Sequence, residues 1–167
     1  QAAPLSGVDL SIDLMVRMAT EISGVSYFKI ETTQTADKLR ALIAAGGDAI
    51  AGPFDGEESI TLIADLNAGA TGTMPSALPP DLIRPVLTHH AAGNSTAAET
   101  QYANILPLIN FENRQCGLRA CKAVMMEGGV ITTDHVRHPL PPLPTETRAQ
   151  LLDLARPLDP IALRWGR

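Results

Sequence analysis

The spacing of hydrophobic and polar residues in the first 94 positions alternates between that of helices and that of strands. Apolar side chains at helical spacing predict a helix over 10–22, with Ser11 as a typical N-cap and Gly24 after its end. The next segment, 25–31 (VSYFKIE), is rich in β-branched and aromatic residues and predicts a buried strand. The residues before the first helix resemble the end of an earlier strand.

Two more units of the same kind follow. They predict strands over 48–51 and 70–74 and helices over 35–45, 57–68 and 80–90, joined by short loops such as GPFDG at 52–56. Strands that alternate with helices across short loops are typical of right-handed βαβ units, which form a parallel sheet. The first part of the chain is therefore predicted to be an α/β structure.

After residue 94 only helices are predicted, over 95–111, 115–126 and 145–156, around a proline-rich extended segment at 128–144. Two architectures fit this order: a small doubly wound α/β sheet, or the C-terminal half of a (β/α)8 TIM barrel, strands 6 to 8, followed by extra C-terminal helices. A complete barrel needs about 250 residues, more than the 167 present. Because the chain begins with Gln1, we expect the N-terminal half of one barrel domain to be missing, with 1–94 as βα units and 95–167 as terminal helices.

The composition narrows the classes of function. Hydrophobic residues make up 45% of the chain and charged residues 19%, with a net charge of −5, which is typical of a soluble globular protein. No run rich in lysine and arginine occurs, so nucleic acid is not an expected partner. No apolar run approaches the roughly 20 residues of a membrane span, so we expect no membrane contact.

The cysteines and histidines indicate neither a disulfide nor a metal. Cys116 and Cys121 lie on different faces of one predicted helix, which does not favour a bond between them. Free thiols suit a reducing cytoplasm, the expected location. The four histidines form no HExxH pattern and no CxxC pattern occurs, so no metal site is expected.

One of the three lysines lies in an unusual place. Lys38 is on the polar side of a predicted helix and Lys122 is on a helix of mixed character, and both are expected to be solvated or to extend their ammonium groups to water. Lys29 lies inside the apolar strand 25–31. Both faces of a parallel sheet are usually covered, and desolvation lowers the pKa of a lysine, which makes the neutral amine needed for Schiff-base chemistry accessible near pH 7.

Glu31 follows two residues later, so its side chain is expected on the same face of the strand as Lys29, about 6.6–7 Å away along the backbone. Two interpretations stay open. The two groups are either a structural ion pair, or a nucleophilic amine beside an acid/base carboxylate at the end of a strand, where α/β proteins build their sites.

The other strand ends supply further candidates for a binding site. Gly52 stands where a ligand could approach the backbone, and Phe54 and Asp55 are placed in the loop after the predicted strand. GATGTMPSA brings Met74 and Ser76 to the corresponding end of the next strand. Neither segment is a phosphate-binding fingerprint.

The segments GVDLS, VSYFKIE, GGDAIAGPFDGEE and LNAGATGTMPSALPPDLIRPV resemble the second half of the dihydrodipicolinate synthase / N-acetylneuraminate lyase family, over nearly the whole chain. The resemblance implies a (β/α)8 barrel with a Schiff-base lysine on its sixth strand. Finer segments such as QAAPLSGVDLS, TMPSALPPDLIRPV and LINFENRQCGLRA are similar to a branch of the family that dehydrates a 2-keto-3-deoxy sugar acid.

The resemblance also implies roles for matching residues. Lys29 would form the imine with the substrate, Gly52 would lie near it through its backbone, and Met74 would line the pocket. Asp55 and Ser76 would contact the hydroxylated tail of the sugar acid, beside Phe54 in the first of these loops.

The first residue departs from the family pattern. Gln1 aligns with a tyrosine that relays protons to the imine. Glutamine cannot relay protons in this way but can hydrogen-bond a substrate hydroxyl or a water, so the acid/base role shifts to Glu31.

The implied reaction is loss of water from a small-molecule 2-keto-3-deoxy sugar acid, without a metal or organic cofactor because the imine is the electron sink, in an enzyme that is usually a homotetramer. Two alternatives remain. An aldolase would use the same imine to cleave the C3–C4 bond and give pyruvate. In a non-catalytic domain, Lys29 and Glu31 would be only a buried ion pair.

Overall fold

The structure, a computed structural model, describes residues 1–166. It divides into two compact units, Gln1–Met74 and the residues from Pro75 onward. The helix at 80–91 falls in the second of these units.

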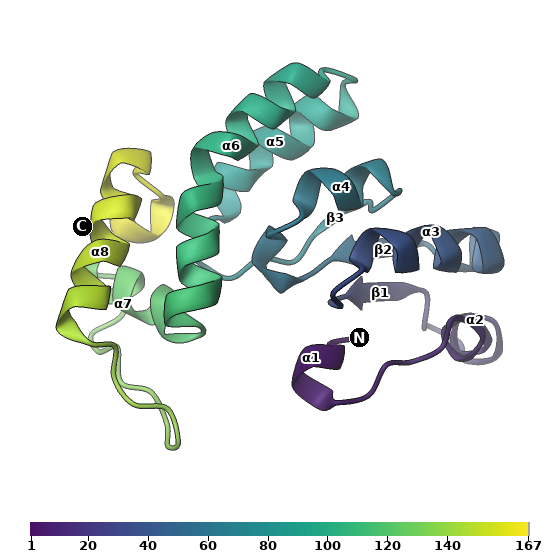
Figure 1. Ribbon diagram of the computed structural model, residues 1–167, viewed down its shortest axis with the longest axis horizontal. Coiled ribbons are helices and arrows are strands. Elements are labelled where there is room, and N and C mark those ends of the chain that lie inside the picture. Colours follow the sequence, from purple (N-terminus) through teal and green to yellow (C-terminus); the bar gives the residue numbers. More distant parts are fainter. Residues whose placement is uncertain (167) are drawn as a thin grey trace. The chain divides into compact units, whose positions relative to one another are not determined.

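The first unit contains a parallel sheet of three strands in the order β1-β2-β3 (Figure 1). The strands are β1 (Tyr27–Ile30), β2 (Gly52–Asp55) and β3 (Gly72–Thr73). The helices and turns are α1 (Ala3–Ser6), α2 (Ile12–Glu21), α3 (Thr35–Gly46), η1 (Gly47–Ala49), η2 (Glu57–Ser59) and α4 (Leu62–Asn67). Parallel strands joined through helices are the predicted βα arrangement.

The first residues extend this sheet on the free side of β1. Ala2 bridges Glu31 in parallel, and the amide of Glu31 donates to the carbonyl of Gln1 at 2.7 Å. The predicted strand end before the first helix is therefore confirmed.

The strand β1 shows which face of the sheet is covered by helices. Phe28 and Ile30 are buried, whereas Tyr27 is 63% exposed. The buried apolar residues of α2, α3 and α4 are Met15, Leu39, Leu42, Leu62 and Leu66. Since side chains alternate along a strand, Lys29 lies on the face opposite this core.

The second strand lies later in the chain than the sequence predicts. The predicted strand 48–51 falls on the turn η1 and the residues after it, and the predicted loop GPFDG contains β2 itself. Gly47 ends α3 with a positive φ of 49°. The residues after it form the turn η1, so the chain joins the sheet only at Gly52. The helix predicted over 57–68 is also shorter, because Glu57–Ser59 form a left-handed turn before α4.

The second unit is helical. It contains α5 (Pro80–Ala91), α6 (Ser95–Phe111), the π-turn η3 (Glu112–Cys116), α7 (Arg119–Glu127), α8 (Thr145–Ala155), η4 (Arg156–Leu158) and η5 (Ile161–Leu163). Helices α5 and α6 lie side by side (Figure 1). The core is formed by Leu78, Leu108, Ala120, Val124, Leu151, Leu152 and Leu163, among others. The helix predicted from 115 begins at Arg119, because the π-turn and Gly117, with φ of 60°, interrupt it.

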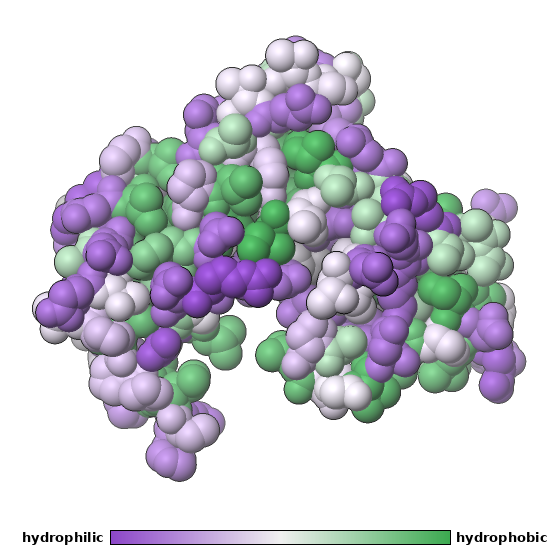
Figure 2. Space-filling model, viewed as in Figure 1, coloured by the Kyte–Doolittle hydropathy of each residue, from purple (hydrophilic) through white to green (hydrophobic). Residues whose placement is uncertain are grey.

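The first unit leaves some apolar side chains uncovered. Leu5 is 83% exposed and Val8 57% exposed, and hydrophobic surface is visible over the region of α1 (Figure 2). Apolar surface of this kind is typical of a face that packs against another element. Among residues 1–166, no helix combines the length and the hydrophobicity that crossing a bilayer requires.

Candidate active site

Lys29 and Glu31 form an ion pair on the open face of β1. Lys29 Nζ lies 3.2 Å from Glu31 Oε2, and the two side chains are 35% and 14% exposed. The alternation of strand side chains predicts this shared face, and the contact confirms it. The amine is therefore held beside a carboxylate at the C-terminal end of the strand, with one side still open to water.

Aromatic rings lie beside the amine on the same face. Phe54 pairs with Lys29 in the register of β1 and β2. Its ring stacks on that of Tyr27, with centroids 6.0 Å apart and planes inclined by 17°. Phe54 thus lies in the strand next to Lys29, not in a loop beyond it, and forms an apolar side of the site.

The glycine that approaches Lys29 is Gly56. A Cβ on Gly56 would lie 3.0 Å from Lys29 Cε and 2.9 Å from both Glu31 Cβ and the carbonyl oxygen of Ile30. No larger residue fits there without moving the ion pair or the strand. Sequence reasoning missed this residue, although the second glycine of GPFDG was the available signal.

Gly52 is the glycine predicted for this place. It pairs with Tyr27, two positions before Lys29, and a Cβ there would meet the Tyr27 ring at 2.6 Å. The strand begins at Gly52 and not after it, and the predicted position of its backbone near the imine stays a prediction. Gly52 leaves room for the tyrosine ring.

Asp55 is also misplaced by the sequence prediction. It is the last residue of β2, pairs with Ile30, and is 1% exposed. Since Ile30 faces the helices, the Asp55 side chain lies on the opposite side of the sheet from Lys29. A buried carboxyl on that side does not reach a substrate bound at Lys29.

Burial raises the pKa of the Asp55 carboxyl to about 8, and its hydrogen bond to Asp65 acts in the same direction. Hydroxyl groups oppose the shift: Thr73 Oγ1 donates to Asp55 Oδ2 at 2.6 Å, and Ser59 also hydrogen-bonds the carboxyl. Burial dominates, so Asp55 holds a proton at neutral pH.

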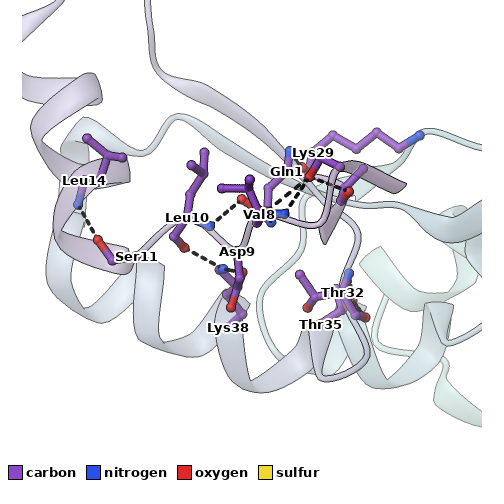
Figure 3. Close-up of polar contacts among 12 residues, drawn as sticks. Gln1, Val8, Asp9, Leu10, Ser11, Leu14, Lys29, Thr32, Thr35 and Lys38 are labelled. Carbon is purple, nitrogen blue, oxygen red and sulfur yellow. Dashed lines mark hydrogen bonds and ion pairs between the residues drawn. The ribbon is translucent and has the colours of Figure 1, made fainter. Parts of the chain in front are cut away.

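Gln1 uses its side-chain amide locally. Gln1 Oε1 accepts from the amide of Leu10 at 2.8 Å, and Nε2 donates to the carbonyl of Val8 at 3.0 Å. Figure 3 shows these bonds and the Lys29 side chain extending away from them. The bridge to β1 places Ala2, not Gln1, level with Glu31. The amide therefore fixes the segment before α2, and its predicted contact with the substrate stays a prediction.

Lys38, which was expected to be solvated, contacts the same segment before α2. Its ammonium pairs with Asp9 and donates to the carbonyl of Leu10 at 2.7 Å, and its side chain is 11% exposed. Lys38 is thus a structural cation that ties the chain before α2 to α3 (Figure 3).

Met74 and Ser76 follow β3. Thr73 pairs with Asp55 and shares its face, so the next residue, Met74, points to the Lys29 face, where it is 42% exposed. Ser76 belongs to the second unit, where its hydroxyl accepts from the amide of Leu78 at 3.2 Å. The predicted roles of both residues in substrate binding stay predictions.

The two thiols are free. Burial raises the pKa of Cys116 to about 11 and also raises the pKa of Cys121. Neither thiol is therefore a ready nucleophile at neutral pH. Within residues 1–166, no three histidine, cysteine or carboxylate side chains form a group that could hold a metal ion.

Comparison with known proteins places this geometry in a family. The Dihydrodipicolinate synthetase family matches residues 2–157. The chain belongs to this family. A curated relative, the L-2-keto-3-deoxyarabonate dehydratase of Azospirillum brasilense, is 56% identical over 166 residues, which are 99% of this chain and 54% of the relative.

Solved structures of the family have the same fold. Dihydrodipicolinate synthase from Rhodopseudomonas palustris aligns with a TM-score of 0.81 at 22% identity, over 92% of this chain and 53% of that one. The enzyme from Acinetobacter baumannii, in complex with pyruvate, aligns with a TM-score of 0.76 at 28% identity, over 90% and 50%. The chain thus spans about half the length of these relatives. The prediction of the C-terminal half of a TIM barrel is confirmed, and the small doubly wound sheet is excluded.

Proposed function

We propose that this chain carries the imine-forming side of the active site of an enzyme that dehydrates L-2-keto-3-deoxyarabonate to 2-oxoglutarate semialdehyde, in the non-phosphorylating breakdown of L-arabinose. The observation that carries the proposal is the 3.2 Å Lys29–Glu31 pair at the C-terminal end of a parallel strand, where βα barrels place their active sites. The name of the Azospirillum brasilense relative supports the choice of substrate.

The first chemical step uses Lys29 as a nucleophile. Its neutral amine attacks the C2 carbonyl, a carbon–nitrogen bond forms, and the carbonyl oxygen leaves as water. The protonated imine that results withdraws electrons from C2 and makes the C3 protons acidic. Glu31, held beside the amine, removes one of them and leaves an enamine.

The second step breaks the C4–oxygen bond. The electron pair of the enamine expels the C4 hydroxyl, which takes a proton from the same Glu31 carboxyl and leaves as water. Tautomerisation turns the C5 hydroxyl end into an aldehyde, and hydrolysis of the imine regenerates Lys29. The imine accepts the electron pair released at C3, and the enamine returns it when the C4–oxygen bond breaks, so the proposed mechanism uses no metal or organic cofactor.

The neighbouring residues would shape the site around these atoms. Gly56 leaves space for the carbon attached to the imine nitrogen, since a Cβ on Gly56 would lie 3.0 Å from Lys29 Cε. Phe54 and Met74 supply apolar surface on the same face. Ser76 remains our candidate for a hydroxyl of the substrate tail. We further propose that the enzyme is a cytoplasmic homotetramer, as the family resemblance implies.

Borohydride trapping tests the proposal on the full-length protein. Reduction in the presence of L-2-keto-3-deoxyarabonate should fix an adduct on Lys29, located by peptide mass spectrometry, and Lys29→Ala should abolish it. Lys122→Ala is the matched control, because Lys122 donates only to a backbone carbonyl on the surface of the second unit. An adduct on Lys122, or none, would overturn the assignment.

The product distinguishes the remaining alternatives. Dehydration gives an aldehyde and no pyruvate, whereas an aldolase gives pyruvate that a coupled lactate dehydrogenase assay detects. If Lys29→Ala lowers the stability but the wild-type protein forms no adduct, the Lys29–Glu31 pair is structural and the proposed function is wrong.

A further inference from the structure

Two buried carboxyl groups face each other behind the sheet, on the side away from Lys29. Asp55 ends β2 and Asp65 lies on α4, and they are 1% and 0% exposed. Their side chains hydrogen-bond to each other. Two buried carboxyl groups in contact are not both ionised at neutral pH, because neither burial nor a like charge favours the carboxylate, so the pair holds a proton.

The hydrogen bonds indicate where that proton lies. Asp65 Oδ2 accepts from the hydroxyl of Thr61 at 2.6 Å, but Oδ1 is buried and no amide, hydroxyl or ammonium of the described residues donates to it. A proton on Asp55 would supply a donor to the Asp65 carboxyl. The raised pKa of Asp55 agrees with this assignment.

The same pair is linked to a strained turn. Thr73 Oγ1 donates to Asp55 and lies 2.6 Å from Ser59 Oγ. Ser59 is the last of three consecutive residues with left-handed φ, which are 48°, 53° and 70° for Glu57, Glu58 and Ser59. Side chains disfavour this region of φ, so contacts elsewhere must hold the turn in place.

The turn lies directly after Gly56. The amide of Ser59 donates to the carbonyl of Gly56 at 3.0 Å, and Gly56 contacts Lys29 and Glu31 on the front of the sheet. Hydrogen bonds thus connect the back of the sheet to the Gly56 backbone, which lies beside the ion pair. We propose that the proton shared by Asp55 and Asp65 holds the 57–59 turn, and with it the Gly56 backbone, in position beside Lys29. Asp55 and Asp65 are then positioning residues for the imine-forming site.

Other charges near the pair do not neutralise it. Asp65 on α4 is the ionisable group that hydrogen-bonds Asp55, and Glu57 and Glu58 belong to the turn itself. The charged residues of the strand and helix beside β2 are paired elsewhere, as Lys29 with Glu31, Lys38 with Asp9, and Arg40 with Asp37. The proton, and not a cation, therefore stabilises the pair.

Asp55→Asn tests the inference in the full-length protein. The amide of asparagine keeps a donor for Asp65 and an acceptor for Thr73 but does not titrate. Above its pKa of about 8, the protonated fraction of Asp55 falls, by about tenfold between pH 7 and 9. Between pH 7 and 9, the yield of the borohydride-trapped Lys29 adduct should fall by the same factor in the wild type relative to Asp55→Asn. The control is Asp48→Asn, at an exposed position, which should show the pH profile of the wild type.

The expected effect on trapping at Lys29 rests on the proposed function. Two further measurements test the shared proton independently of that function. Amide hydrogen exchange over 56–60 should accelerate above pH 8 in the wild type relative to Asp55→Asn, whether or not the protein forms an imine. The infrared band of a protonated carboxyl should be present in the wild type at pH 7 and lost above pH 8, even if Asp55→Asn fails to fold.

The outcomes are distinct. No adduct on Lys29 at any pH overturns the proposed function alone. Absence of the protonated carboxyl band at pH 7, or equal pH profiles of exchange in the wild type and Asp55→Asn, overturns the shared proton as the support of the turn. A wild-type adduct whose pH profile matches that of Asp55→Asn overturns the link to Lys29.

Discussion

Replacing Gly56 with alanine measures how closely the backbone approaches Lys29, the lysine proposed to form the imine. The new Cβ would lie 2.9 Å from the carbonyl oxygen of Ile30 and 3.0 Å from Lys29 Cε, both shorter than ordinary van der Waals contact. The Lys29 side chain can move, but the Ile30 oxygen belongs to β1 and cannot. Overpacking of this kind costs about 1–3 kcal/mol in the free energy of unfolding.

The larger effect is expected on the reaction. Relief of the Lys29 contact moves Nζ from its position 3.2 Å from Glu31 Oε2. A displacement of about 1 Å in a catalytic group can cost on the order of 100-fold in rate. We expect Gly56→Ala to slow imine formation by this order, measured by single-turnover trapping, while urea unfolding reports the smaller change in stability.

Gly52→Ala is the matched control. Its Cβ would meet the Tyr27 ring at 2.6 and 2.8 Å, but this ring is 63% exposed and can rotate away. We expect a loss below about 1 kcal/mol and a normal rate of imine formation. The reasoning is refuted if Gly52→Ala blocks the reaction and Gly56→Ala reacts at the wild-type rate.

Three further substitutions or conditions test separate parts of the structure. Glu31→Gln should still form the Lys29 adduct but lower kcat by about 10²–10⁴-fold, the usual contribution of a general acid/base; an unchanged kcat would assign that role elsewhere. The pKa of Asp55 is 3.8 in an ordinary environment and about 8 in the folded protein. Its protonated form therefore contributes to the free energy of unfolding fully below pH 3.8, and this contribution is lost as the pH rises through 8. Between pH 5 and 8 the wild type should lose about 3–4 kcal/mol relative to Asp55→Asn in urea unfolding, and parallel curves would contradict the raised pKa. Cys116, with a pKa of about 11, should react with a disulfide reagent about a hundredfold more slowly when folded than when denatured, which a spectrophotometric thiol assay follows; equal rates would show an accessible thiolate.

The helices were predictable where the sequence carries terminal signals. Helices α5, α6 and α8 begin as predicted at Pro80, Ser95 and Thr145. Proline in the first turn and Asn94, whose side chain caps α6 through the amide of Ala97 at 3.3 Å, are local signals. Such features act within a few residues, so the sequence suffices to locate them.

The second strand was not predictable in this way. Pro53 lies inside β2, a central strand, where proline normally removes a ladder hydrogen bond. Here its carbonyl accepts from the amide of Thr71 at 2.9 Å, and β3 begins only at Gly72. The backbone nitrogen of Pro53 therefore faces the chain before the start of β3, where no ladder hydrogen bond is needed. Where β3 starts relative to Pro53 depends on the tertiary structure and cannot be read from the sequence. The prediction consequently placed the strand earlier and Asp55 in a loop.

The register of β1 and β2 also decides which carboxyl can act on the substrate. Period-two alternation along β1 puts Glu31 on the Lys29 face, and this needs no knowledge of the neighbouring strand. Asp55 is one residue out of phase with that face, because it pairs with Ile30. The Asp55 carboxyl interacts with the buried Asp65. The side-chain amide of Gln1 hydrogen-bonds the backbone of Val8 and Leu10. Of the groups predicted for the site from the first unit, Glu31 is therefore the one with both the position and the ionisable carboxyl that the proposed proton transfer at C3 and C4 requires.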